Sequence, residues 1–236
     1  MKKKNESSEQ LNIQLFLLCM LVALLCRRLG KISSLRIICG MLRTMIYVGV
    51  YIGWGISIYK RVIQKSVRNV LIFIAELIIF WFVVRTTKYF FTMDNQIARY
   101  LWYSYYIPML FIPVAVLQAA FFLGKSEEYR LPKWLKGVYI PTAVLVLLVL
   151  SNDLHQLVFS FPVGSAWSDS NYTYGWGYYV VLVWEVVSAL TAFVLMIYKC
   201  RHSQKKKYLP LLGIGAAVLY AVLFINGVAW VQEIGG

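Results

Sequence analysis

Three charged side chains lie inside apolar stretches of the sequence, where their types and depth suit particular chemistry. They are Arg43, Glu76 and Glu185, each in a different stretch. If these stretches cross a membrane, a charge within the bilayer is costly, so each side chain is expected to face the interior of a helix bundle and to have a partner. Arg43 and Glu185 are predicted at comparable depth, which makes an ion pair between them feasible. A ligand or proton site is the alternative.

The connection formed by residues 151–177 carries a second set of candidates. It contains no Lys or Arg, and its His155 is accompanied by two separated acids, Asp153 and Asp169. One histidine with two such acids is a weak pattern for a metal site. A hydrogen-bonded structural turn is therefore favoured, and no metal is predicted.

Aromatic side chains gather at the predicted outer face, within residues 81–91, 100–106 and 176–179. Amphipathic rings suit an interfacial belt, but they also suit an apolar cavity that opens outward. In such a cavity the ring faces supply contact area and can hold a cation, while an acid and an imidazole orient the ligand. The candidate ligand-binding residues are Trp102, Tyr106, His155, Trp176, Tyr179 and Glu185.

Helices that cross a membrane must position these residues. The chain of 236 residues is 60% hydrophobic and only 14% charged. In lipid every backbone amide must be paired within its own segment, which requires helices. We predict an all-α membrane protein, a polytopic transmembrane helical bundle of about seven spans, multi-pass in the cell (plasma) membrane and in contact with the lipid bilayer. The apolar segments are residues 11–26, 35–58, 69–84, 100–123, 137–150, 178–198 and 208–231.

The net charge of +14 is concentrated in the connections between these segments and in the N-terminal tail. Loops on alternate sides differ clearly in Lys and Arg, and the bias places the N-terminus in the cytoplasm. Such charge sets topology, so nucleic acid is not an expected partner. Residues 1–34 are predicted to form a cytoplasmic basic tail, an N-terminal anchor helix that is not cleaved, and a linker. Residues 35–236 are predicted to form one multi-span domain.

The sequence contains no recognisable enzyme core. HExxH, P-loop and GxSxG motifs are absent, so no catalytic residue, no enzymatic activity and no cofactor are predicted. The four cysteines have no CxxC spacing, which argues against a disulfide framework and a zinc site.

Three motifs carry a resemblance to a known family. They are RYLWYSYYIPMLFIP at residues 99–113, SNDLHQLVFSF at residues 151–161 and YTYGWGYY at residues 172–179. With these motifs, residues 42–230 resemble the N-terminal seven-transmembrane region of bacterial sensor histidine kinases, which also occurs on diguanylate cyclases. The resemblance implies an extracellular polar corner at the second motif. The family's last span and its cytoplasmic output domain are expected to be missing here. The output domain is then either absent or supplied separately, and the chain is either a fragment or a stand-alone relic.

The resemblance implies a membrane-embedded input module of a two-component-type signalling receptor. Such a module is expected to sense a small extracellular ligand or the state of the membrane, and a homodimer is compatible with it. One alternative is a small transporter or channel-like protein that uses Glu76 and Glu185 in an ion or proton path. Another is a membrane anchor without a ligand.

Overall fold

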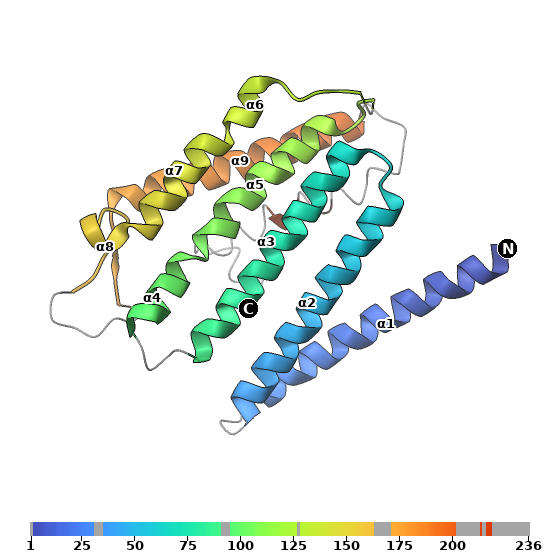
Figure 1. Ribbon diagram of the computed structural model, residues 1–236, viewed down its shortest axis with the longest axis horizontal. Coiled ribbons are helices and arrows are strands. Elements are labelled where there is room, and N and C mark those ends of the chain that lie inside the picture. Colours follow the sequence, from blue (N-terminus) through green and yellow to red (C-terminus); the bar gives the residue numbers. More distant parts are fainter. Residues whose placement is uncertain are drawn as a thin grey trace.

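A computed structural model describes residues 2–30, 35–90, 95–126, 128–162, 171–201, 213 and 216–218. Helices dominate this part of the chain, and one short two-stranded hairpin accompanies them (Figure 1). The elements are α1 (Lys2–Leu29), α2 (Arg36–Arg61), α3 (Lys65–Phe90), α4 (Asn95–Tyr103), α5 (Tyr106–Phe122), α6 (Lys133–Gly137), α7 (Tyr139–Leu150), α8 (Asn152–His155), β1 (Phe159–Ser160), β2 (Thr173–Tyr174) and α9 (Trp176–Arg201).

Within the described residues, 5 helical segments are long and apolar enough to cross a membrane. They correspond to five of the seven predicted segments, so the prediction of an all-α polytopic membrane protein is confirmed. Predicted segment 11–26 lies within α1, and predicted segment 208–231 lies almost entirely outside the described residues. The five spans are Arg36–Arg61, Lys65–Lys88, Gln96–Phe122, Lys133–Leu150 and Trp176–Lys199.

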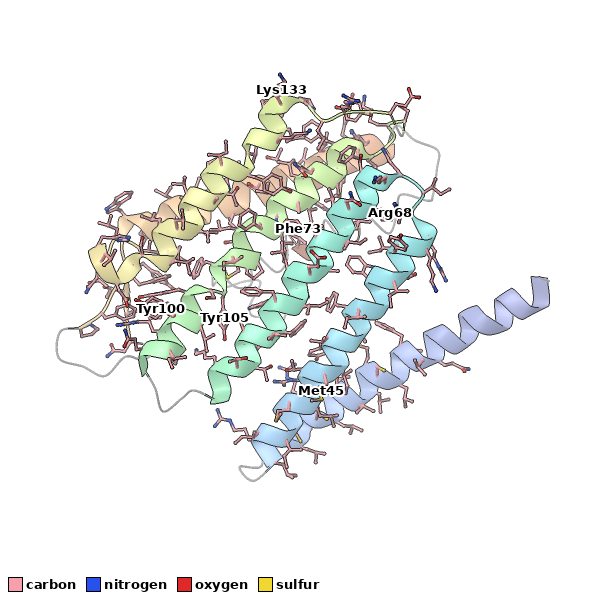
Figure 2. The ribbon with its side chains drawn as sticks, viewed as in Figure 1. Met45, Arg68, Phe73, Tyr100, Tyr105 and Lys133 are labelled. Carbon is pink, nitrogen blue, oxygen red and sulfur yellow. The ribbon has the colours of Figure 1, made fainter. Side chains whose placement is uncertain are left out.

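The spans pack side by side around α5 (Figure 1). Helix α3 packs between α2 and α5, whereas α7 and α9 pack on other sides of α5. Most of α5 is therefore buried, and its neighbours keep one face exposed for lipid. Figure 2 shows Phe73 of α3 at the centre of this arrangement, where its ring meets those of Phe111 and Tyr139.

The bundle has two distinct ends. Helices α4 and α8 lie at one end with the β1–β2 hairpin, whereas the α2–α3 turn and α6 lie at the opposite end (Figure 1). Following the predicted orientation, we call these the outer end and the inner end. Helix α1 crosses α2 near the outer end and then diverges from it. Small residues allow this crossing, because buried Ala23 and Cys26 of α1 and buried Cys39 of α2 lie along it with Gly30.

One span is broken in two. Pro108 has no N–H to donate, so the carbonyl of Ser104 has no ordinary helical partner four residues ahead. That carbonyl accepts instead from the amide of Ile107, at 3.2 Å. The chain therefore turns at Ser104–Tyr105 and separates α4 from α5. Pro113 sits inside α5, where dense packing on several sides tolerates it.

Candidate ligand-binding region at the outer end

The outer end is organised around the side chain of Asn152. This residue is fully buried, and its amide group makes four hydrogen bonds. Oδ1 accepts from the backbone amides of Val158 and Phe159, each at 3.0 Å. Nδ2 donates to the Phe159 carbonyl at 2.8 Å and to the Tyr103 hydroxyl at 3.2 Å. Asn152 thereby satisfies backbone groups that neither a helix nor the hairpin would satisfy.

An ion pair ties helix α4 to this corner. Arg99 Nη2 lies 2.8 Å from Asp153 Oδ2, and the Tyr103 hydroxyl donates to Asp153 Oδ1 at 2.7 Å. Arg99 and Tyr103 are one helical turn apart on α4, so one carboxylate holds both. The outer half of the broken span is therefore attached to α8.

His155 serves the same turn. Its Nδ1 accepts from the backbone amide of Leu157 at 3.0 Å, so the ring proton belongs on Nε2. Nε2 then donates toward the Leu148 carbonyl at 3.1 Å and lies 3.2 Å from Ser151 Oγ. Both ring nitrogens are thus engaged in the structural turn that the sequence favoured. Within the described residues, no group of three or more His, Cys, Asp or Glu side chains could hold a metal ion.

Two glycines let the hairpin approach the start of α9. A Cβ at Gly175 would lie 2.1 Å from the Leu157 carbonyl oxygen, and one at Gly177 would lie 3.0 Å from the same atom. Without side chains, the Gly177 amide donates to that oxygen at 3.0 Å, and the Gly175 amide donates to the Val158 carbonyl at 2.9 Å. The spacing Gly-x-Gly is therefore a requirement of close backbone packing.

The ring of Phe159 is the centre of an aromatic cluster that sequence reasoning missed. Nothing in the letters LVFSF distinguishes this residue, because its contacts come from segments far away in the chain. It is fully buried between helices α4, α5 and α9 and the hairpin. We call this set the Phe159 cluster: its rings lie between 4.6 Å (Trp102) and 6.3 Å (Tyr103) from that of Phe159, centroid to centroid, and belong to Trp102, Tyr103, Tyr106, Tyr172, Tyr174 and Tyr178.

Three of the six predicted ligand-binding residues come together at this cluster. Trp102 and Tyr106 belong to it, and Glu185 lies close enough to Tyr106 to interact with it electrostatically. Glu185 is only 1% exposed. It also interacts electrostatically with Tyr178, which lies about two helical turns earlier on α9. The interior of the outer end therefore combines aromatic faces with one carboxylate.

The other predicted residues lie apart from this interior. Trp176 is 61% exposed and Tyr179 is 56% exposed, so both rings point away from the buried cluster. Tyr178 takes the inward position instead, with its ring stacked 4.0 Å from that of Tyr174. His155 belongs to the turn between α8 and β1, and none of the described ring contacts joins it to the Phe159 cluster.

The structure also separates the three charges found within apolar segments. Helices α3 and α5 lie between α2, which carries Arg43, and α9, which carries Glu185 (Figure 1). The feasible ion pair between these two residues is therefore not formed in the structure. Glu76 is exposed on α3, along the face that also exposes Phe80 and Val83, contrary to the expectation that it faces the interior.

Comparison with protein families shows which family the chain matches. The model of the N-terminal 7TM region of histidine kinase matches residues 37–232. The chain belongs to this family. No curated protein and no solved structure matches the chain.

The match includes α2 to α9, so the broken span, the Asn152 corner and the Phe159 cluster all lie within the family region. The family is a membrane sensor module of histidine kinases, which implies a cytoplasmic output partner. Helix α1 lies outside the match.

Proposed function

We propose that this 7TM region is the input module of a two-component-type receptor and that it senses a small extracellular ligand. The ligand would bind at the outer end and change the packing of α4, α5 and α9. A cytoplasmic output domain, in the same chain or supplied separately, would read that change. A two-state shift of this kind requires only that the ligand bind one packing better than the other.

The observation that carries this proposal is the burial of Glu185 beside the Phe159 cluster. A carboxylate at bilayer depth is costly, and such residues commonly mark functional sites. Here the acid adjoins Tyr106 and Tyr178, so aromatic surface and a negative charge converge. This combination suits a small ligand with a cationic group, which ring faces and a carboxylate attract together.

The packing of α5 and α9 supports transmission toward the inner end. The two helices are packed together along their lengths, and α9 continues to Arg201. At the inner end, Lys199 of α9 donates to the carbonyls of Ala120, Phe121 and Leu123 at the end of α5, at 3.0, 2.7 and 3.2 Å. A shift of α9 relative to α5 at the outer end would therefore be felt at this contact.

The transporter alternative has less support. A proton or ion path through Glu76 and Glu185 needs both acids along one route. Glu185 is in the interior on α9, whereas Glu76 is on the exposed face of α3, with α5 between the two helices.

A binding and flux experiment tests the proposal. The full chain is reconstituted in vesicles, and a panel of small amines and zwitterions is screened for a shift in thermal unfolding and for uptake. A ligand present at 100 times its Kd should stabilise the fold by about 2.7 kcal/mol. Glu185→Gln and Trp102→Ala should remove the shift.

Tyr179→Ala is the matched control, because this exposed ring is on the same helix and one residue from buried Tyr178. The variant should keep the shift. Uptake that depends on Glu76 would contradict the sensor proposal and restore the transporter. Loss of the shift in Tyr179→Ala, with Glu185→Gln unaffected, would place the ligand on the outside of the bundle.

A further inference from the structure

Two connections at the inner end form a strongly basic surface. The α2–α3 turn and the α5–α6 connection are held together by a hydrogen bond from Gln64 Nε2 to the Ser126 carbonyl, at 3.2 Å. Figure 2 shows Arg68 and Lys133 at this same end of the molecule. We call the following side chains the inner basic patch: Lys60, Arg61, Lys65, Arg68, Lys125, Arg130, Lys133 and Lys136.

Large apolar side chains project from the α2–α3 turn and from α6 at the same end. Ile63 is 83% exposed between Arg61 and Lys65, and Trp134 is 62% exposed between Lys133 and Lys136. Exposing large apolar side chains to water is unfavourable. Tryptophan in particular is suited to the headgroup level of a bilayer, where its ring is partly apolar and partly wet. The patch thus combines cations with groups that enter the interface.

Arg68 differs from the rest of the patch in having a buried polar atom without a hydrogen-bond partner among the described residues. Its guanidinium lies over the ring of Tyr59, with Cζ 4.9 Å from the centroid. Its Nε is buried and has no hydrogen-bond partner in the described part of the chain. Arg68 forms no ion pair with a carboxylate of the described residues. An arginine of this kind is a suitable donor for a phosphate group.

We propose that the inner basic patch binds the phosphate-bearing headgroups of anionic phospholipids, with Arg68 as the central donor. Lys60 at the end of α2 and Lys65 at the start of α3 flank it, and Ile63 of the α2–α3 turn and Trp134 of α6 enter the interface beside them. Juxtamembrane cations attract anionic headgroups over about a Debye length. The exposed apolar side chains favour a lipid over a soluble acidic partner, because a bilayer interface places an apolar neighbour directly beside its anionic headgroups. This site is independent of the ligand proposed at the outer end.

The experiment compares lipid binding in matched variants of the full chain. The protein is placed in nanodiscs of phosphatidylcholine, with or without phosphatidylglycerol. Retained lipid is counted by native mass spectrometry, and thermal unfolding is measured in parallel. Phosphatidylglycerol should be retained preferentially and should raise the Tm. Arg68→Gln should weaken its retention about fivefold, the effect of one interfacial cation.

Arg85→Gln is the control, because it removes the same charge from the exposed outer half of the same helix. It should leave retention unchanged. If Arg68→Gln does not fold, the exposed pair Lys60→Gln and Lys65→Gln provides the measurement, and it should also lower retention. Equal loss in the Arg68 and Arg85 variants, or no preference for phosphatidylglycerol, would overturn the proposal. So would unchanged retention in the folded lysine pair.

A second arm separates the two sources of phosphate. Inorganic phosphate is added to nanodiscs of phosphatidylcholine alone, and the Tm should stay constant. A rise in Tm that matches the effect of phosphatidylglycerol, and that Arg68→Gln abolishes, would assign the site to a soluble anion and contradict the lipid assignment.

Discussion

Asn152 shows how one side chain can replace regular structure at the residue scale. Its amide group binds two backbone amides, one carbonyl and one hydroxyl, so the chain can reverse direction between α8 and β1 without exposing polar groups. Gln156, which ends α8, has a positive φ of 50°, a conformation that costs a residue with a Cβ. The hydrogen bonds of Asn152 compensate for that cost.

Asn152→Ala should therefore destabilise the outer end strongly. The change leaves the amides of Val158 and Phe159 buried without partners, and we expect a loss of about 3 kcal/mol or more in the free energy of unfolding. Thermal or denaturant unfolding in detergent measures it. Ser160→Ala is the control, since that hydroxyl makes only a long contact to Gln156 at 3.4 Å. An Asn152→Ala variant as stable as the control would contradict the structural role.

The residues of the corner could be predicted from the sequence, but the orientation of the rings could not. Asn152, His155 and the Gly-x-Gly motif have unusual types for their positions, which marks them as a structural turn. The start of α9 reads Trp-Gly-Tyr-Tyr, and hydropathy does not reveal which ring faces inward. The helix register places Tyr178 inside and its neighbours Trp176 and Tyr179 outside. Phe159 became visible only through contacts with distant segments.

At the scale of elements, Lys199 connects two spans through the end of one helix. The last carbonyls of a helix have no intrahelical partner and carry partial negative charge. The ammonium group of Lys199 satisfies three carbonyls at the end of α5. The connection from α5 to α6 then begins with a turn, in which the Lys125 amide donates to the Phe122 carbonyl at 3.0 Å.

Lys199→Met should loosen this contact while keeping the length of the side chain. We expect a loss of about 2 kcal/mol in the free energy of unfolding, because charge-assisted hydrogen bonds are the stronger kind. Unfolding in a zwitterionic detergent measures it, so that anionic lipid makes no contribution. Lys136→Met, which alters an exposed lysine at the same end, should change stability little. Equal losses of stability in the two variants would show that the contacts of Lys199 with the carbonyls do not stabilise the protein.

The separation of Arg43 from Glu185 leads to a prediction about coupling. Glu185→Ala should destabilise the protein, because it empties a buried position on α9, and Arg43→Ala should have its own independent effect. Because α3 and α5 lie between the helices, the double variant should show the sum of the two effects, within about 0.5 kcal/mol. A double-mutant cycle of detergent stability provides the test. Partial recovery in the double variant would mean that the two side chains meet.

Hydropathy located the spans well and their internal breaks poorly. Predicted segment 35–58 corresponds closely to α2, because its apolar run has clear basic boundaries. Predicted segment 100–123 is one apolar run, yet it contains the end of α4 and the whole of α5. The break depends on a single missing N–H at Pro108, which does not alter hydropathy. Hydropathy also fails to reveal the separation of α6 from α7, because both helices belong to one continuous span.

At the scale of the whole molecule, the charge bias predicts which end of the bundle faces the cytoplasm. In a version without native cysteines, Thr173→Cys at the outer end should react with a membrane-impermeant thiol reagent in intact cells. Ser126→Cys at the inner end should react only after the cells are opened. Both positions are exposed, so access to the reagent does not limit either reaction. The reverse pattern would invert the topology and move the proposed sensor site into the cytoplasm.

The corner of Asn152 also has a consequence for the time scale on which backbone hydrogens exchange with deuterium. The amides of Val158 and Phe159 belong to no helix and lie near the watery end of the molecule, where exchange is ordinarily fast. Both are hydrogen-bonded to a fully buried oxygen, so they exchange only when Asn152 leaves its position. Their exchange in heavy water should therefore be slow, like that of amides in the packed spans. The exchange rate of these two amide hydrogens would report how often the outer end opens.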